Sequence, residues 1–456
     1  MKQEYRGVIS FILLCSLSLI FVSCAVSAPA LSVSPGPSSS ERAASASVPD
    51  RDAATAAEGA AGEEIPAEEL FFHTAAEGTV HDAGFYEITL REDGSGNIYN
   101  TDFDALRRTV LCSRPGCSHC EEGCSGYLPC AANIPEVMAA SDLLIFAYSG
   151  NPYYFTDLGD QTLARVEIRD LNGENARTIC TFDANVQLDF NFAFSESALF
   201  ALGTTFQSES TVAQREVIKI DLATGEKTVL ARFDGGSEER YYFVGAAKGK
   251  LFFKKSWIDE ALLNGAEITS TEDITNALSF ALFTVDPRTG ETAEVRRWES
   301  GETLQKIVGD ACFYVNPGSI DQLDLDTYEI KRVVSGQEYC SPDTVEQVYF
   351  MDPYLIYNIH YPAEDPADAV IKRFVCNVET LELRESTLTT SFRGISDPVF
   401  IAALTPRFLL VGYSIEEVPP AEQPAFLSSI RRRYAMLDFQ AFVQNQPDYA
   451  MISEDF

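Results

Sequence analysis

Basic residues are scarce in this chain of 456 residues. Lys and Arg number 34 against 68 Asp and Glu, which gives a formal net charge of −34 and an isoelectric point near 4.4. Proteins that bind polyanions take most of their affinity from Lys and Arg contacts to phosphate, so the sequence predicts no nucleic-acid partner. The charge alone is typical of a solvated acidic surface, with a cation-binding face as the alternative.

Histidine is also scarce, with four residues, and no serine or cysteine nucleophile signature accompanies it. His360 ends a predicted strand, and His73 and His81 are isolated near the start of the folded part, so we interpret all three as structural rather than as catalytic bases. No carboxylate pair for acid–base work stands out among the 68 acids. The sequence therefore predicts no catalytic residue.

A calcium loop is absent as well. Asp321, Asp324 and Asp326 stand close together, but they lack the alternating ligand loop with its glycine. We interpret them as outward-facing carboxylates of a strand.

A long apolar run occurs only at the N-terminus. Lys2 and Arg6 precede the apolar stretch 8–22, which is too short to span a bilayer comfortably and is typical of an export signal. The closing Phe21-Val-Ser-Cys24 resembles the lipobox of bacterial lipoproteins. We therefore predict a lipoprotein signal peptide over residues 1–23 and lipidation of Cys24, with ordinary secretion and cleavage near Ala28 or Ala30 as the alternative.

Residues 24–66 are dominated by Ala, Ser, Pro, Gly and Glu and have almost no aromatic or large aliphatic side chains. Such a segment buries too little apolar surface to fold, so we predict a disordered tether. A flexible chain of this length has a reach of about 35 Å, enough to hold a folded domain clear of a membrane.

Residues 67–456 consist of short alternating segments punctuated by Gly, Asn and Asp. In the stretch 216–233, Ile218, Ile220 and Leu222 share one parity, and Ala-Thr-Gly225-Glu supplies the turn between two strands. Similar turns recur along the chain, and we take as equivalent marks Asp102, Asp170, Asp221, Asp286, Asp324, Asn377 and Asp438.

The sequence predicts an all-β fold, a β-propeller. It has about four predicted strands per mark, the marks recur at irregular intervals, and no segment forms a convincing amphipathic helix. Seven marks favour seven blades, with six or eight as alternatives, and two β-sandwiches are the competing fold. Three insertions of loop composition, at 258–276, 361–366 and 416–424, are candidates for a binding rim.

One dense cluster of chemistry-bearing residues occupies a loop at 112–130, which holds five of the eleven cysteines. Cys112, Cys117, His119 and Cys124 follow a C-x4-C-x-H-x4-C pattern that could close a tetrahedral shell around a structural zinc. Export favours the rival interpretation, disulfide bonds, and free or redox-active thiols are a third. In a metal site of this kind Cys120 and Cys130 would be left to pair with each other.

The segment from Tyr99-Asn-Thr-Asp-Phe through this loop to Ser-Gly-Tyr127-Leu resembles a group of uncharacterised bacterial lipoproteins with a β-propeller domain and an N-terminal C-x4-C-x-H-x4-C loop. The resemblance implies the fold and a lipid-anchored place on the extracytoplasmic face of a bacterial cell membrane, and it implies no activity. Cys120 and Cys130 are additional to the group's pattern.

These features lead us to expect an anchored binding module for a glycan or protein partner. A carbohydrate-active lyase or hydrolase and a cell-envelope assembly factor are the alternatives. Trp257, Tyr361 and the pair Tyr153-Tyr154 are candidates for stacking on a glycan, although each is more often part of a blade core. The ligand itself, the oligomeric state and any certain cofactor do not follow from the sequence.

Overall fold

The computed structural model describes residues 69–74, 78–82, 84–91, 95–129, 133–151, 162–208, 211–233, 239–258, 277–298, 303–309, 311–363, 369–392, 395–417 and 430–455. The chain divides into two units, Met1–Ala67 and Glu68–Phe456, and the description below concerns the second. The predicted signal peptide, the lipidated Cys24 and most of the three insertions lie outside the described residues.

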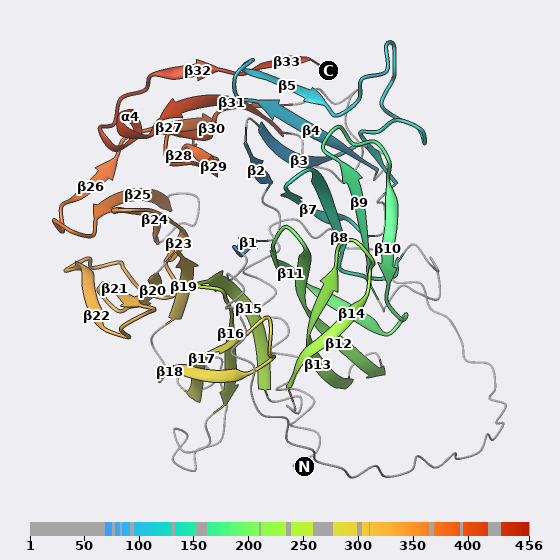
Figure 1. Ribbon diagram of the computed structural model, residues 1–456. Coiled ribbons are helices and arrows are strands. Elements are labelled where there is room, and N and C mark those ends of the chain that lie inside the picture. The colour runs from blue at the N-terminus through green and yellow to red at the C-terminus, as the bar shows by residue number, and fades with distance from the viewer. Residues whose placement is uncertain are drawn as a thin grey trace, which may run out of the picture. The chain divides into compact units, whose positions relative to one another are not determined.

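Seven antiparallel sheets, each with a core of four strands, follow one another in a ring (Figure 1). Blade 1 consists of β2 Thr79–His81, β3 Gly84–Leu90, β4 Gly96–Asp102 and β5 Arg107–Val110, and blade 2 of β7 Pro135–Ala140, β8 Leu143–Tyr148, β9 Arg165–Asp170 and β10 Arg177–Thr181. Blade 3 consists of β11 Val186–Phe194, β12 Ala198–Ser208, β13 Thr211–Asp221 and β14 Lys227–Phe233, blade 4 of β15 Glu239–Ala247, β16 Lys250–Ile258, β17 Leu278–Val285 and β18 Thr292–Trp298, and blade 5 of β19 Thr303–Val308, β20 Ala311–Asn316, β21 Ser319–Asp324 and β22 Ile330–Ser335. Blade 6 consists of β23 Val345–Met351, β24 Tyr354–Tyr361, β25 Val370–Asn377 and β26 Leu383–Ser386, and blade 7 of β29 Phe400–Leu404, β30 Phe408–Glu417, β31 Ile430–Asp438 and β32 Tyr449–Met451. The prediction of an all-β, seven-bladed propeller is confirmed.

The remaining described elements are short. They are β1 Phe71–His73, β6 Tyr127–Leu128, β27 Thr389–Phe392, β28 Ile395–Pro398, the one-turn helix α4 Phe439–Val443 and β33 Ser453–Asp455. None of the helices in the described part of the chain is long and apolar enough to cross a membrane.

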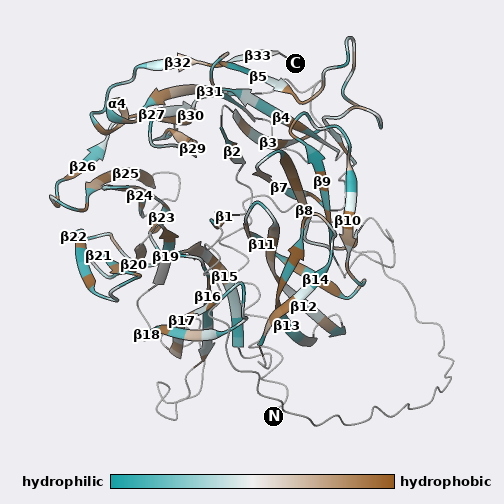
Figure 2. Ribbon diagram, in the orientation of Figure 1, coloured by the Kyte–Doolittle hydropathy of each residue, from teal (hydrophilic) through white to brown (hydrophobic). Residues whose placement is uncertain are grey.

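The apolar core is divided among the interfaces between blades. Seven clusters of buried side chains each join two neighbouring blades, and the last of them packs Phe85 and Phe103 of blade 1 against Leu410 and Tyr434 of blade 7. Figure 2 shows apolar colour along inner strands such as β7 and β8 and hydrophilic colour on the outer β22 and β26. A chain of this length therefore folds as one unit without a single oversized core.

The repeated marks are caps of turns. The side-chain oxygen of each of six marks accepts hydrogen bonds from the backbone N–H groups two and three residues later: Asp102, Asp221, Asp286, Asp324, Asn377 and Asp438. Hydrogen bonds from Thr224 and Thr327 hold the pKa values of Asp221 and Asp324 below the usual range. The repeat thus arises from turn chemistry and not from a ligand site.

One of these turns makes a close contact with the preceding blade. Gly225 has φ +74°, and a Cβ there would lie 2.0 Å from the backbone oxygen of Ile179 on β10. Gly336 has nearly the same φ, +71°, but a Cβ there would meet nothing within 4 Å.

We therefore expect Gly225→Ala to lower the free energy of unfolding by about 3 kcal/mol, the sum of left-handed strain and overpacking. Gly336→Ala, the matched control, is expected to cost about 1 kcal/mol because only the strain applies. Urea unfolding of the two variants measures both losses. If the free energy of unfolding falls equally in both variants, the close contact with Ile179 contributes nothing to stability.

The C-terminus closes the ring. β33 pairs in parallel with β5, so the last strand becomes the outer strand of the first blade. The Glu454 side chain, 1% exposed, lies between Arg433 at 3.2 Å and Arg108 at 3.7 Å. Arg108 also contacts Glu87 at 2.7 Å, so four side chains from blades 1 and 7 and the terminal strand form one buried ionic network.

The acidic triplet on β21 and its following turn differs from expectation. Asp321 is buried and ion-paired with Arg332 at 2.9 Å, so the prediction of outward-facing carboxylates is wrong for this residue. Asp324 caps the turn, and Asp326 pairs with Lys248 of the neighbouring blade at 2.8 Å. The alternation of the strand places Asp321 inward, where a long Arg side chain reaches it from β22.

Candidate metal centre

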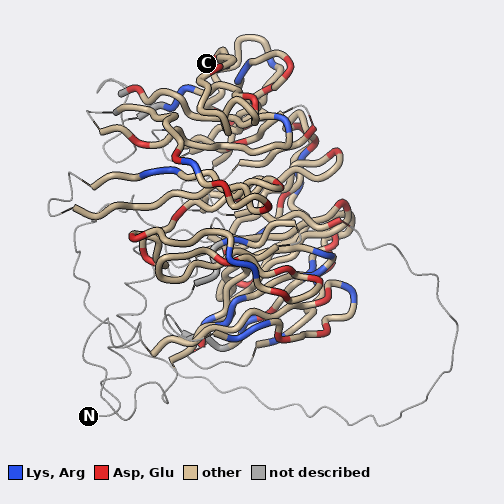
Figure 3. The backbone as a smooth tube through the Cα atoms, turned by 90° about the vertical axis from the view of Figure 1, so that its left-hand side faces the viewer, with Lys and Arg blue, Asp and Glu red and all other residues tan. Residues whose placement is uncertain are grey.

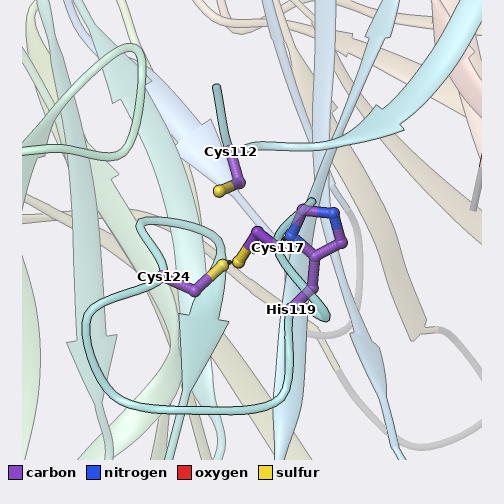
Figure 4. A group of neighbouring side chains, drawn as sticks. All are labelled: Cys112, Cys117, His119 and Cys124. Carbon is purple, nitrogen blue, oxygen red and sulfur yellow. Dashed lines mark hydrogen bonds between the residues drawn. The ribbon is translucent and has the colours of Figure 1, made fainter. Parts of the chain in front are cut away.

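Residues 111–128 connect β5, the outer strand of blade 1, to the start of blade 2. Figure 4 shows Cys112, Cys117, His119 and Cys124 of this loop pointing toward one another. Their ligand atoms all lie within 4.8 Å of each other, and they form the one group of three or more potential metal ligands within the described ranges. The structure thus brings together all four residues that the spacing singled out.

Tight turns fold the loop back on itself. The N–H of Cys117 donates to the Arg114 carbonyl, and that of Cys124 donates to the Glu121 carbonyl. Gly116 and Gly123 take φ values of +70° and +94°, which only glycine adopts without strain. These turns place each cysteine at the end of a short reversal, facing the centre of the loop.

His119 is held by blade 1. It has φ +55°, which is uncommon for a residue with a side chain, and its carbonyl accepts hydrogen bonds from Asn97 Nδ2 at 2.8 Å and Arg91 Nη1 at 3.3 Å. Both donors belong to the β3–β4 hairpin region. The backbone strain is therefore balanced by contacts that fix the position of the imidazole.

The other end of the loop is held by blade 2. The Ser125 carbonyl accepts a hydrogen bond from Arg169 Nη1 of β9 at 2.8 Å, and Ser125 Oγ donates to the Leu111 carbonyl at 2.8 Å. Gly173 on the β9–β10 turn approaches Ser125 and Leu111 so closely that a Cβ there would lie 2.8 Å from the Ser125 oxygen. The cluster therefore lies where the first two blades are joined.

One distance within the cluster matches that of a tetrahedral zinc site. His119 Nδ1 lies 3.5 Å from Cys124 Sγ. Zn–S and Zn–N bonds of about 2.3 and 2.0 Å in a tetrahedron separate sulfur from nitrogen by roughly 3.5 Å. Three sulfurs and one imidazole nitrogen are also the donor set that zinc prefers in structural sites.

The thiols influence one another's protonation. Burial and the neighbouring Cys112 and Cys117 raise the pKa of Cys124 to about 12. Burial alone would also raise the pKa of Cys112, but hydrogen bonds from the Arg114 backbone and from the other two thiols lower it. The pKa of Cys112 is thus below and that of Cys124 above the usual range of a thiol, and a metal would have to displace the proton of Cys124.

The other cysteines are arranged differently. Cys120 is exposed and lies 2.9 Å from Ser118 Oγ, while Cys130, its predicted disulfide partner, lies outside the described residues. All eight cysteines within the described ranges are free. Burial raises the pKa of the core residues Cys340 and Cys376 to about 11, so these thiols are inert.

The three remaining histidines, His360, His73 and His81, lie on different strands and do not form a catalytic group in the described part of the chain. His360 is exposed on β24, the second strand of its blade, opposite Ile371. His73, which the sequence showed as isolated, is buried and contacts Glu136 of β7 at 3.2 Å. His81 is partly buried on β2.

The candidate aromatic platforms have basic neighbours. Trp257 is partly buried, with Lys255 and Arg297 at 5.5 and 5.0 Å from its ring centre. Tyr361 packs on Tyr339 at 4.9 Å and has Lys372 at 5.3 Å. Tyr153 and Tyr154 lie outside the described residues.

No model of a known protein family matches the chain, and the comparison with curated proteins found no match. Among solved structures, an oligogalacturonate lyase in complex with manganese is 13% identical, with a TM-score of 0.42 over 81% of this chain and 85% of the other. A puromycin-hydrolyzing peptidase of Mycobacterium tuberculosis is 12% identical, with a TM-score of 0.46, and its match covers 80% of this chain but 51% of the peptidase. The oligogalacturonate lyase of Vibrio parahaemolyticus is 13% identical, with a TM-score of 0.40 over 82% and 84% of the two chains. At such identities these similarities concern the fold and transfer no activity to this chain.

Proposed function

We propose that this chain is a lipid-anchored, extracytoplasmic β-propeller that binds a glycan or protein partner without chemistry of its own. In this proposal Cys112, Cys117, His119 and Cys124 hold a structural zinc that fastens blade 1 to blade 2. The observation that supports it best is the closed set of four protein ligands.

Four protein ligands leave no open position on a tetrahedral ion. Catalytic zinc sites keep three protein ligands and leave the fourth position to water or substrate, whereas structural sites fill all four. The loop also follows an outer strand and is bound on both sides by the frameworks of two blades. A metal here would stabilise the junction and would not act on a substrate.

The enzyme alternative, a lyase or hydrolase on this scaffold, would need a cluster of carboxylates with His360 near the inner strands. Within the described ranges His360 is exposed on a second strand, and no group of three metal-ligating side chains accompanies it.

The anchor is the part of the proposal that a single substitution tests. In a bacterial host, the full chain is expected in the membrane fraction and labelled by an alkyne fatty acid, whereas Cys24→Ser is expected unlabelled and in the soluble fraction. Cys15→Ser, in the same apolar stretch, is the control and should behave as the wild type. A labelled Cys24→Ser variant, or a wild-type N-terminus near Ala28 or Ala30, would overturn the anchor.

Binding itself is tested with the soluble Cys24→Ser chain, purified without chelator. Its native mass spectrum is expected to contain a zinc ion and, on part of the population, a further mass that is lost on denaturation and is the co-purified ligand. If mixed substrates such as pectin, chitin or casein are degraded by the pure chain, the proposal of a binding module is wrong.

A further inference from the structure

The described strands and turns of blade 4 differ in charge balance from the protein as a whole. The whole chain has twice as many acids as bases, but the described strands and turns of blade 4 have twice as many bases as acids. The bases are Arg240, Lys248, Lys250, Lys254, Lys255, Arg288, Arg296 and Arg297, and the acids are Glu239, Asp286, Glu291 and Glu294. Figure 3 shows blue segments gathering toward the lower blades of that view.

Strand register brings five of these bases to one end of the blade. Lys254 and Lys255 lie opposite Tyr242 and Tyr241 of β15, and opposite Leu282 and Ala281 of β17. On the other side of β17, Leu282 and Ala281 lie opposite Arg296 and Arg297 of β18. Arg240 is the residue next to Tyr241 on β15, toward the same end of the blade. We call Arg240, Lys254, Lys255, Arg296 and Arg297 the basic end of blade 4.

On the side toward blade 3 the bases have partners. Lys255 Nζ lies 2.7 Å from Glu239, and Arg297 lies 2.9 Å from Glu294. Both bases also lie over Trp257. This side is therefore neutralised within the protein.

On the side toward blade 5 Lys254 forms no ion pair with any described residue. Its Nζ lies among aromatic rings, 5.3 Å from the centre of Tyr242 and 5.4 Å from that of Phe280. Burial lowers the pKa of Lys254 to about 8, in keeping with an ammonium group that has lost water without gaining a counter-charge.

Two further polar groups here lack acceptors. The Tyr242 hydroxyl is buried without a hydrogen-bond partner, although Ser256 and Arg240 are close, and so is Nε1 of Trp298, a residue only 6% exposed. Trp298 lies directly opposite Phe280, and Tyr242 directly opposite Lys254. Buried donors without partners are rare in native proteins, and a bound ion or water is the common reason for them.

We propose that the basic end of blade 4, on its side toward blade 5, binds a small organic anion. Its carboxylate or phosphate oxygens accept hydrogen bonds from Lys254 Nζ, Tyr242 Oη and Trp298 Nε1, and its carbon skeleton packs on Phe280. The inference rests on the proposed binding function and narrows its ligand to an acidic one, such as an acidic sugar residue or a phosphorylated compound.

The acidity of the remaining protein favours a small anion over a polymer or a membrane surface. A net charge of −34 repels polyanions and anionic lipids at a distance. A compact anion at the basic end of blade 4 would instead lie within about one Debye length of the Lys and Arg side chains on the described strands of this blade.

The experiment uses isothermal titration of the soluble Cys24→Ser chain with inorganic phosphate, D-glucuronate and uncharged D-glucose. Binding of glucuronate, of phosphate or of both, and none of glucose, is expected. Tighter binding of glucuronate would indicate an acidic sugar as the source, and tighter binding of phosphate would indicate a phosphorylated compound. Equal binding of glucose, or no binding of either anion, would overturn the site.

Lys254→Met, which keeps the length of the stem, is expected to weaken anion binding at least tenfold, and Tyr242→Phe about threefold. Lys250→Met is the matched control, because Lys250 is exposed at the other end of the same strand, and its affinity should stay within twofold of the wild type. Unchanged zinc content and circular dichroism show that each variant is folded. If Lys254→Met binds as the wild type does, the site is wrong.

Failure of this site is distinguishable from failure of the proposed function. A co-purified ligand mass that persists in Lys254→Met would leave the binding module intact and remove the anion site. Vesicles of phosphatidylglycerol that bind the wild type, with no binding of glucuronate or phosphate, would instead assign the basic end to a membrane.

Discussion

Cys124→Ser is expected to abolish zinc binding and to lower the melting temperature more than any other single substitution in the loop. Cys124 is the most buried of the four residues, and serine supplies no thiolate in its place. If zinc is present at a thousand times its dissociation constant, its loss removes about 4 kcal/mol of stability. For a domain of this size the melting temperature should fall by roughly 5 °C.

Inductively coupled plasma mass spectrometry and differential scanning fluorimetry of the soluble chain provide the measurement. Cys120→Ser is the matched control, because Cys120 belongs to the same loop but is exposed and outside the cluster. It should keep one zinc per chain and the wild-type melting temperature. A wild type without zinc, whose denatured mass shows disulfides within residues 112–130, would refute the metal centre.

The same experiment has a defined pH dependence. Zinc binds thiolates, so binding must displace the proton that Cys124 holds with its raised pKa. Protons and zinc therefore compete, and zinc affinity should fall as the pH is lowered. The stabilisation by zinc should be largest at alkaline pH and be lost on acidification.

Glu454→Ala is expected to have the second largest effect. Glu454 is the shared acceptor for Arg108 and Arg433 and belongs to the strand that closes the ring. Its removal takes the buried acceptor away from both arginines, although Arg108 keeps Glu87 and Arg433 keeps Glu416, and the lost charged contacts cost about 3 kcal/mol. We expect this loss in urea unfolding, together with earlier proteolysis at the junction of blades 1 and 7.

Glu385→Ala is the control for an exposed pair. Glu385 lies 3.2 Å from Lys372, but the two side chains are 49% and 39% exposed, so the loss should be at most about 1 kcal/mol. Equal losses for the two variants would mean that β33 contributes no more to closure than an ordinary surface contact.

Much of the fold was predictable because blades are local structures. In six of the seven blades the connection between the third and fourth strands is specified by alternation and by an Asp or Asn whose side chain caps the turn, and these signals lie within a few residues of one another. Seven marks gave seven blades for this reason. The pairing of β33 with β5 joins segments about 350 residues apart, and no local pattern encodes it.

The cluster of Cys112, Cys117, His119 and Cys124 was predictable in its residues and not in its surroundings. The spacing of Cys112, Cys117, His119 and Cys124 singled out the group because all four lie in one short loop. The contacts of Asn97 and Arg169 that hold the loop come from two different blades. The burial of Asp321 was mispredicted although strand alternation places it inward, because the ion pair with Arg332 that compensates its charge comes from the next strand and only the register shows it.

By itself the sequence determined the all-β class, favoured seven blades and singled out the four residues of the Cys/His cluster, since each depends on neighbours in the chain, and it predicts an export signal with its tether. Only the tertiary structure decided how the ring closes through Glu454, how the loop is held between two blades, and that strand register brings Lys254, Tyr242 and Trp298 to the same end of blade 4. The physical reason is that these arrangements depend on register and packing between strands far apart in sequence, where burial changes the chemistry of each group.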